Sequence, residues 1–199
     1  MRNIVLGGLA SFCFGSFGWG MARHFRRDGP VSAGAAATGV LGFVFAAAQL
    51  GALAARPVVY FWLAAGLYVA SLGLFCLAVL ATRGKGLGVC FEKTVPGGVV
   101  TAGPYRWIRH PFYVAYLLCW LAGWAAVAWW PLGASVAVMG WLYRRSAIAE
   151  ERALEAAHGE AYRAYVRRTG RFWPKASAWS SRFEYRAGGV GACRIDPGK

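Results

Sequence analysis

The sequence has 199 residues, of which 58% are hydrophobic and only 15% are charged. A soluble domain of this size needs more polar surface than this composition supplies, so the composition indicates an integral membrane protein that has the lipid bilayer as a partner. The net charge of +14 would also suit a nucleic-acid-binding protein, but the Lys and Arg residues lie between apolar runs, as they do at membrane edges, and we expect no nucleic-acid partner.

Three long apolar runs occupy the N-terminal part of the chain, at residues 4–22, 31–55 and 58–81. Each run is long enough to cross a membrane as a helix. The first run has an alternative interpretation as an uncleaved signal-like segment. A spanning helix is favoured because the arginine cluster of residues 23–27 follows the run, whereas a cleavable signal carries its positive charge in front. Residues 1–81 are therefore expected to form a unit of three transmembrane helices.

A helical hairpin is predicted after a glycine-rich, charged loop at residues 82–111. The fourth apolar run begins at Pro111, a residue that suits the first turn of a helix, and is expected to continue to Trp130, where Pro131 breaks it. A shorter run follows and extends to about Ile148. It is expected to return as the second arm of a tight hairpin, so that the chain forms an all-α bundle of about five transmembrane helices.

The basic residues of such a bundle lie mostly on one side of the membrane. The loops on that side and the C-terminal segment hold nearly all of them, whereas the other side holds Arg2 and Arg56. The positive-inside rule then predicts a cytoplasmic C-terminus and an external N-terminus, and we expect the membrane to be a bacterial inner membrane.

A polar amphipathic helix is predicted after the last span, at about residues 146–168. A stripe at helical spacing defines its apolar face: Leu154, Ala157, Ala161, Tyr162 and Tyr165. Residues 176–199 have neither an apolar run nor clear periodicity, and we expect a poorly ordered tail.

The cysteines are expected to be packing residues. They are widely spaced, with no C-x-x-C pair and no histidine at the spacing of a zinc site. They are Cys13, Cys76, Cys90, Cys119 and Cys193. The sequence therefore predicts no metal site.

Two polar segments flank the predicted hairpin, residues 103–113 before it and the pair Glu150–Glu151 after it. Because the arms of a short hairpin run antiparallel, both segments are expected to meet at the same membrane surface. Helical spacing places Glu150 in line with Leu154, Ala157 and Ala161, and Glu151 in line with Tyr162, so both acids border the apolar stripe. In a structural alternative, the acids pair with nearby arginines of the same helix.

The chemistry of these residues suits S-adenosylmethionine, which carries an ammonium, a carboxylate and a sulfonium. Glu150 and Glu151 supply acids for the cations, and Arg109 and His110 supply donors for the carboxylate. Arg109 and His110 are equally well suited to anchoring beside lipid headgroups. A dinucleotide-binding turn is not supported, because the glycines of residues 84–88 follow a membrane span and precede no strong helix.

The C-terminal half, residues 82–175, resembles the isoprenylcysteine carboxyl methyltransferase family and the related phospholipid N-methyltransferases. The resemblance rests on residues 101–113, on Glu150–Glu151, and on the segment from His158 to Pro174. That family carries an R-H-P-x-Y-x-G motif, of which this chain has all but the last residue: Arg109, His110, Pro111 and Tyr113 match, and Ala115 replaces the glycine. This replacement adds a methyl group where the helix is expected to approach the cofactor.

The resemblance implies that this half binds S-adenosylmethionine and that the substrate enters from the membrane. The implied cofactor-binding residues are His110, Pro111, Tyr113, Glu150 and Glu151. Arg109 and Arg171 are expected to be catalytic, since a carboxylate or thiolate acceptor would be ionised and would be attracted by their charges. Arg171 also has alternative roles, in binding the cofactor carboxylate or in anchoring the tail to headgroups.

We therefore expect a methyltransferase that uses S-adenosylmethionine on a lipophilic, membrane-dissolved substrate, at a carboxylate or thiol. One alternative is a phospholipid N-methyltransferase. Another is an NADPH-dependent membrane reductase of the sterol-reductase type, against which the Glu150–Glu151 pair argues because two acids would repel the pyrophosphate of a dinucleotide. A third is a non-catalytic membrane scaffold.

Overall fold

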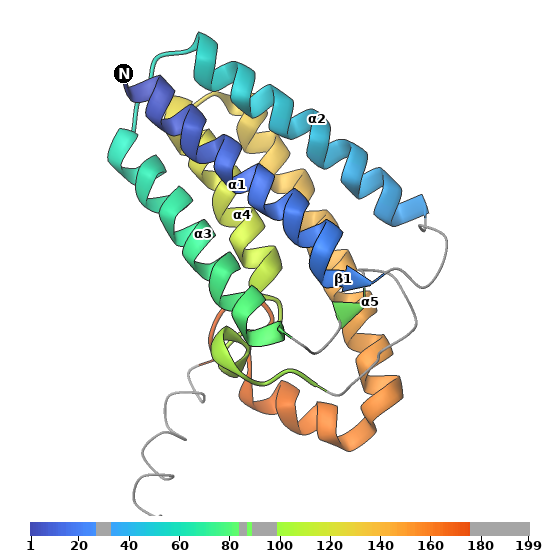
Figure 1. Cartoon of the computed structure of the whole chain (residues 1–199). Coiled ribbons are helices and arrows are strands. Elements are labelled where there is room, and N and C mark those ends of the chain that lie inside the picture. Colours follow the sequence, from blue (N-terminus) through green and yellow to red (C-terminus); the bar gives the residue numbers. More distant parts are fainter. Residues whose placement is uncertain (27–32, 84–86, 89–98, 176–199) are drawn as a thin grey trace, which may run out of the picture.

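The protein is a bundle of five helices that run alternately up and down (Figure 1). A computed structural model describes residues 1–26, 33–83, 87–88 and 99–175. The helices are α1 (Arg2–His24), α2 (Ala33–Ala55), α3 (Phe61–Thr82), α4 (Pro111–Val127) and α5 (Trp130–Arg168). The predicted helical bundle is confirmed. The expected tail at residues 176–199, and Cys90 and Cys193, lie outside the described residues.

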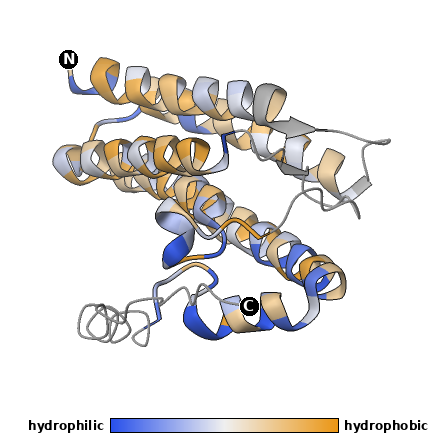
Figure 2. Ribbon diagram, turned by 60° about the horizontal axis from the view of Figure 1, so that its bottom comes forward, coloured by the Kyte–Doolittle hydropathy of each residue, from blue (hydrophilic) through white to orange (hydrophobic). Residues whose placement is uncertain are grey.

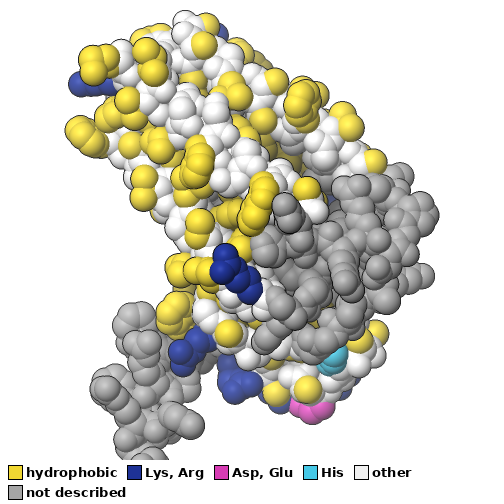
Figure 3. All heavy atoms as spheres, viewed as in Figure 1, with side chains coloured by type: hydrophobic (Ala, Val, Ile, Leu, Met, Phe, Trp, Pro, Cys, Tyr) yellow, Lys and Arg dark blue, Asp and Glu magenta, His cyan; other side chains and the backbone are white. Residues whose placement is uncertain are grey.

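Three of the helices are long and apolar enough to cross a membrane, over Arg2–Ala22, Gly34–Ala55 and Phe61–Thr82. Helix α4 is also apolar but is shorter, with 17 residues. Large hydrophobic side chains such as Phe12, Phe43 and Trp62 are exposed on the bundle. The hydrophobic colours cover its upper part, and hydrophilic residues gather toward the lower end (Figures 2 and 3). These features are consistent with a membrane protein.

The hairpin between α4 and α5 turns a few residues earlier than the sequence predicts. Helix α4 ends at Val127, where Ala128 adopts a left-handed conformation (φ 49°) and donates its N–H to the Trp124 carbonyl at 2.7 Å. Pro131 does not break α4 but lies in the first turn of α5. The reason is that proline lacks the N–H that a first-turn residue does not need, so it starts a helix as readily as it stops one.

The expected fifth span and the expected polar helix at 146–168 form one element, α5. The break lies later, at Gly159, whose φ of 52° and ψ of −124° are not helical. This conformation favours glycine because it has no Cβ. Beyond it the chain turns beneath the bundle (Figure 1). Ala157 and Ala161 are both exposed, so the expected buried stripe does not include them. Ala161 lies beyond the break, where straight helical spacing no longer applies.

Two further short elements lie between the helices. The two-residue strands β1 (Phe25–Arg26) and β2 (Leu87–Gly88) pair in parallel and connect the chain after α1 to the chain after α3. A 3-10 helix, η1 (Gly103–Arg106), precedes α4 and packs against α3. The segment expected to be a loop at 82–111 is thus partly ordered where it is described, and η1 leads directly into the residues that start α4.

A polar side chain ties three helices together inside the apolar bundle. Gln49 of α2 is fully buried, and its Nε2 donates to the Tyr68 hydroxyl of α3 at 2.9 Å and to the Cys119 carbonyl of α4 at 3.2 Å. A buried amide among apolar helices is favourable only when it is hydrogen-bonded. Gly123 makes room for it, because a Cβ at that position would collide with Gln49 Cδ.

Candidate functional site

The segments before α4 and after α5 are joined by a short backbone ladder. The Arg109 N–H donates to the Gly170 carbonyl at 2.8 Å, and the Gly170 N–H donates to the Trp107 carbonyl at 3.0 Å. The His110 N–H donates to the Arg171 carbonyl at 3.2 Å. This ladder joins residues about 60 positions apart in the sequence at the end of the bundle where the two glutamates lie.

Glu151 is the centre of the polar interactions at this end of the bundle. Its Oε1 accepts from Arg109 Nε at 2.9 Å and from Arg171 Nε at 3.0 Å, and its Oε2 accepts from Arg171 Nη2 at 2.7 Å. His110 Nε2 lies 3.1 Å from Oε1. Burial raises the pKa of Glu151, but hydrogen bonds from His110, Arg171 and Arg109 lower it by more, so this pKa lies well below its usual range. Glu151 is therefore an ionised, ion-paired residue.

His110 lies between the two carboxylates. Its Nε2 faces Glu151, and its Nδ1 lies 3.4 Å from Glu150 Oε2. Burial lowers the pKa of His110, but hydrogen bonds to Glu150 and Glu151, together with their charges, raise it above its ordinary value. With an acceptor at each ring nitrogen, the imidazolium is the form that satisfies both. Arg109, His110, Glu150, Glu151 and Arg171 are called the charge cluster below.

Glu150 lies at the more open edge of the charge cluster. Its side chain is 28% exposed, against 11% for Glu151. The Tyr113 hydroxyl donates to Glu150 Oε1 at 2.5 Å. Tyr113 also stacks on Tyr143, with ring centroids 5.1 Å apart, and on His110, at 5.6 Å. Glu150 therefore offers a partly exposed carboxylate that the Tyr113 hydroxyl orients, and such a carboxylate suits a cationic ligand.

The two arginines of the charge cluster differ in how far they are open to a ligand. The Arg109 side chain is 7% exposed, and its Nη1 donates to the Thr169 carbonyl. The Arg171 side chain is 33% exposed. Both hold Glu151, so the cations that pair with this acid are distant in the sequence and do not come from α5 itself. The geometry favours Arg171 over Arg109 for contact with a ligand.

The remaining residues of the predicted motif have structural positions. Pro111 is buried in the first turn of α4. Ala115, which replaces the glycine of the motif, is buried against the α3 side chains Phe75 and Ala78, and its carbonyl accepts from the Ser71 hydroxyl at 2.7 Å. The extra methyl group therefore lies at a contact between α3 and α4.

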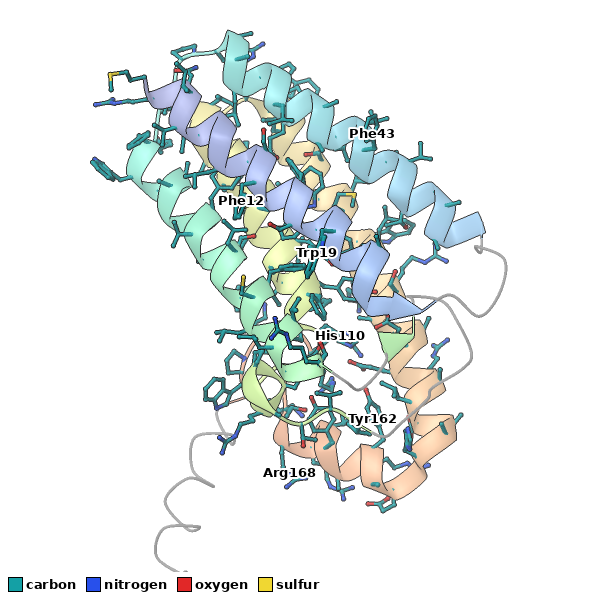
Figure 4. All side chains as sticks on the ribbon, viewed as in Figure 1. Phe12, Trp19, Phe43, His110, Tyr162 and Arg168 are labelled. Atoms are coloured by element: carbon teal, nitrogen blue, oxygen red, sulfur yellow. The ribbon has the colours of Figure 1, made fainter. Side chains whose placement is uncertain are left out.

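Two buried tyrosines next to the charge cluster were not identified as site residues from the sequence. The Tyr165 hydroxyl donates to the Tyr105 carbonyl at 2.8 Å. The Tyr162 hydroxyl has no hydrogen-bond partner among the residues that the structure describes. Figure 4 shows Tyr162 below His110, at the lower end of the bundle. The pattern H-G-x-x-Y-x-x-Y at residues 158–165 indicates that both tyrosines make apolar contacts. It does not indicate which of the two hydroxyl groups has a hydrogen-bond partner.

No metal centre is formed in the described part of the chain, where no group of three or more His, Cys, Asp or Glu side chains is placed to hold an ion. Of the cysteines, Cys13 and Cys119 are buried in the bundle and Cys76 is exposed. The chemical resources of this site are therefore carboxylates, guanidinium groups, an imidazolium and tyrosine hydroxyls.

The charge cluster predicts that the folded protein loses stability both when the pH is lowered and when it is raised. Glu151 has a lowered folded-state pKa, so its contribution is present above its unfolded pKa of about 4.3 and is lost as pH falls through the folded value. His110 has a raised pKa, so its contribution is complete below about pH 6.5 and is lost as pH rises through the folded value. We expect the melting temperature in detergent to be highest between about pH 5 and 6.5. His110→Asn should flatten the decline on the alkaline side, and an identical decline in that variant would contradict the assignment.

One family match was found for this chain. The model of a family described as a protein of unknown function (DUF1295) matches residues 38–169. The match covers most of α2, all of α3, α4 and α5, and every member of the charge cluster except Arg171. No curated protein and no solved structure matches the chain. The family description names no activity, so the resemblance to methyltransferases stays a prediction.

Proposed function

The chain belongs to the DUF1295 family, and we propose that it is a methyltransferase that uses S-adenosylmethionine on a lipophilic substrate dissolved in the membrane. The observation that carries this proposal is the charge cluster, a group of two carboxylates and three basic side chains held at one end of an apolar helical bundle. Polar groups of both signs beside a membrane-type bundle suit a charged cofactor and an apolar substrate that approaches through lipid.

The residues of the charge cluster fit the charges of the cofactor unequally. Glu150 is partly exposed and is oriented by the Tyr113 hydroxyl, so its carboxylate suits the ammonium or the sulfonium. Arg171 suits the carboxylate, because its guanidinium is the more exposed of the two. Glu151 is already neutralised by Arg109, His110 and Arg171, and we assign it a structural role. His110 and Pro111 then support the cofactor indirectly, by fixing the start of α4.

The cofactor would supply a methyl group on a sulfonium, which needs positioning more than acid–base help. The chain's own task is to hold the acceptor in line and to keep it unprotonated. With His110 protonated, the charge cluster holds three cations against two carboxylates, so its field favours an anionic acceptor. We therefore propose a carboxylate or a thiolate as the methyl acceptor, in preference to an amine.

The orientation in the membrane follows from the ends of the helices. Asn3 donates to the Leu53 and Arg56 carbonyls at 2.7 Å each, so the start of α1 and the end of α2 lie together. Arg168 lies at the opposite end, with the charge cluster (Figure 4). By the positive-inside rule we propose that this end and the C-terminus face the cytoplasm, in a bacterial inner membrane.

The test is the transfer of labelled methyl. Purified protein in detergent is incubated with S-adenosylmethionine carrying a tritiated methyl group and with an extract of cell membranes. We expect label in a base-labile ester or in a thioether, and we expect Glu150→Gln to reduce it by about 10- to 100-fold, the value of a hydrogen bond to a charged group. Glu155→Gln is the matched control, because Glu155 lies in the same helix in an exposed pair with Arg163.

The other outcomes decide between the alternatives. Label found only in methylated phosphatidylethanolamine would make the protein a phospholipid N-methyltransferase. Absence of transfer, together with oxidation of NADPH in the presence of the same extract, would favour the reductase. If neither reaction occurs with any membrane extract, the proposal is wrong and a non-catalytic scaffold becomes the better account.

A further inference from the structure

Tyr162 is a buried residue whose hydroxyl group does not contribute to the hydrogen bonding of the described part of the fold. The whole residue is 2% exposed, and its hydroxyl has no hydrogen-bond partner there. An unpaired buried hydroxyl costs about 1–3 kcal/mol, so such groups are rare and need an explanation. Phenylalanine at this position would fill the same space without that cost. The hydroxyl is therefore expected to bond to something that binds there.

The surroundings of this hydroxyl are those of the charge cluster. Burial raises the pKa of Tyr162; the charge of Glu151 raises this pKa further, whereas Arg109 lowers it. Tyr162 lies one helical turn before Val166, whose carbonyl accepts from Arg109 Nη1 at 3.5 Å, so Tyr162 and Val166 are on the same face of α5. Tyr162 therefore brings an unpaired hydrogen-bond donor to the end of the bundle that holds the ion pairs of Glu151.

The Arg171 guanidinium has N–H donors that it does not use to bind Glu151. Arg171 uses Nε and Nη2 to hold Glu151 in a two-point contact, and no hydrogen bond from its Nη1 is formed within the described residues. Its side chain is 33% exposed. A neutral O–H donor and a partly exposed guanidinium at the same end of the bundle suit an anionic group, and a carboxylate presents one oxygen to each of them.

We propose that the Tyr162 hydroxyl and the Arg171 guanidinium together bind a ligand carboxylate at the end of the charge cluster. This inference rests on the proposed function, because the ligand is either the amino-acid carboxylate of the cofactor or the carboxylate of the methyl acceptor. Tyr162 is thus a binding residue for an anionic group, whereas Tyr165 one turn later is a structural residue that holds Tyr105.

The experiment compares Tyr162→Phe with Tyr165→Phe in the full-length protein in detergent. Each variant removes one buried hydroxyl. Tyr162→Phe should leave the melting temperature unchanged or slightly raised, since its hydroxyl has no protein partner. Tyr165→Phe should lower the melting temperature, because the buried Tyr105 carbonyl loses its donor. Equal destabilisation by the two variants would show that the Tyr162 hydroxyl is satisfied inside the protein, for example by a buried water, and would overturn the proposal.

Calorimetry with two pairs of probes identifies the source of the carboxylate. The first pair is S-adenosylhomocysteine and methylthioadenosine, which lacks the amino-acid group; the second pair is decanoate and decanol. If the cofactor supplies the carboxylate, Tyr162→Phe should weaken the binding of S-adenosylhomocysteine by about 10- to 100-fold and leave the binding of methylthioadenosine unchanged. If the methyl acceptor supplies it, Tyr162→Phe should weaken the binding of decanoate by the same factor and leave the binding of decanol unchanged. Tyr165→Phe should leave both affinities unchanged.

The remaining outcomes separate this inference from the proposed function. If the unmodified protein binds S-adenosylhomocysteine and Tyr162→Phe alters neither carboxylate probe, the inference is wrong and the methyltransferase proposal stands. If the protein binds decanoate in a Tyr162-dependent manner but binds neither adenosyl compound, the carboxylate site stands and the cofactor assignment is wrong. Failure to bind any of the four probes contradicts both.

Discussion

Glu151→Gln is expected to lower the free energy of unfolding by about 3–5 kcal/mol, because removing one partner of a buried ion pair leaves the other charges uncompensated. Arg109 and His110 are both 7% exposed and both face this carboxylate. The glutamine has nearly the same shape, so the loss comes from the missing charge and from the replacement of one acceptor oxygen by an NH2 group that faces other donors. In a protein of this length such a change corresponds to a fall of roughly 10 °C in melting temperature, measured by circular dichroism in detergent.

The control for this variant is Glu155→Gln. Glu155 pairs with Arg163 at 2.8 Å, but the two side chains are 48% and 58% exposed, and an exposed pair contributes less than about 1 kcal/mol. The loss of stability caused by Glu150→Gln should lie between those of Glu151→Gln and Glu155→Gln, since Glu150 keeps more contact with solvent than Glu151 does. A Glu151→Gln protein as stable as the Glu155→Gln protein would show that the ion pairs around Glu151 do not hold this end of the fold together.

Gly123→Ala is expected to lower the free energy of unfolding by about 3 kcal/mol, the second largest of the expected effects, because its new Cβ would collide with Gln49. The Cβ would overlap with Cδ, Cγ and Nε2 of the buried amide side chain. Gln49 must then leave its position and give up the bonds to the Tyr68 hydroxyl and the Cys119 carbonyl. The melting temperature in detergent should fall by several degrees.

A matched glycine and a double variant test this explanation. Gly66 lies in α3, and a Cβ added there would meet no atom within 4 Å apart from its chain neighbours and the backbone of its own helix. Gly66→Ala should therefore leave stability unchanged or slightly raised. Combining Gly123→Ala with Gln49→Ala removes the colliding side chain and should recover part of the loss. Additive losses in the double variant would mean that Gly123 is required for another reason.

Much of the fold could be predicted from the sequence because the apolar runs are long and the breaks between them are strong. Arg56 and Pro57 separate the second and third helices, and Pro111 marks the start of α4. The meeting of the R-H-P-x-Y segment with Glu150 and Glu151 also followed, since a short hairpin forces the two ends together. These are consequences of local pattern and chain connectivity.

The remaining features depend on contacts between distant segments. Two adjacent glutamates look equivalent in a sequence. The rotation of about 100° between consecutive helical residues places Glu151 against Arg109 and Arg171 and leaves Glu150 at the open edge. The ladder that positions Arg171 joins backbone groups, which no side-chain pattern reports. The bend at Gly159 was missed for a similar reason, because a single glycine in a helical pattern is compatible with a straight helix.

The most direct test of the central claim is a calorimetric titration of the purified protein in detergent with S-adenosylmethionine and, separately, with NADPH. The proposed site predicts micromolar binding of S-adenosylmethionine that Glu150→Gln weakens by about 10- to 100-fold and Glu155→Gln leaves unchanged. Binding of NADPH with none of S-adenosylmethionine would contradict the account and would assign the charge cluster to a reductase.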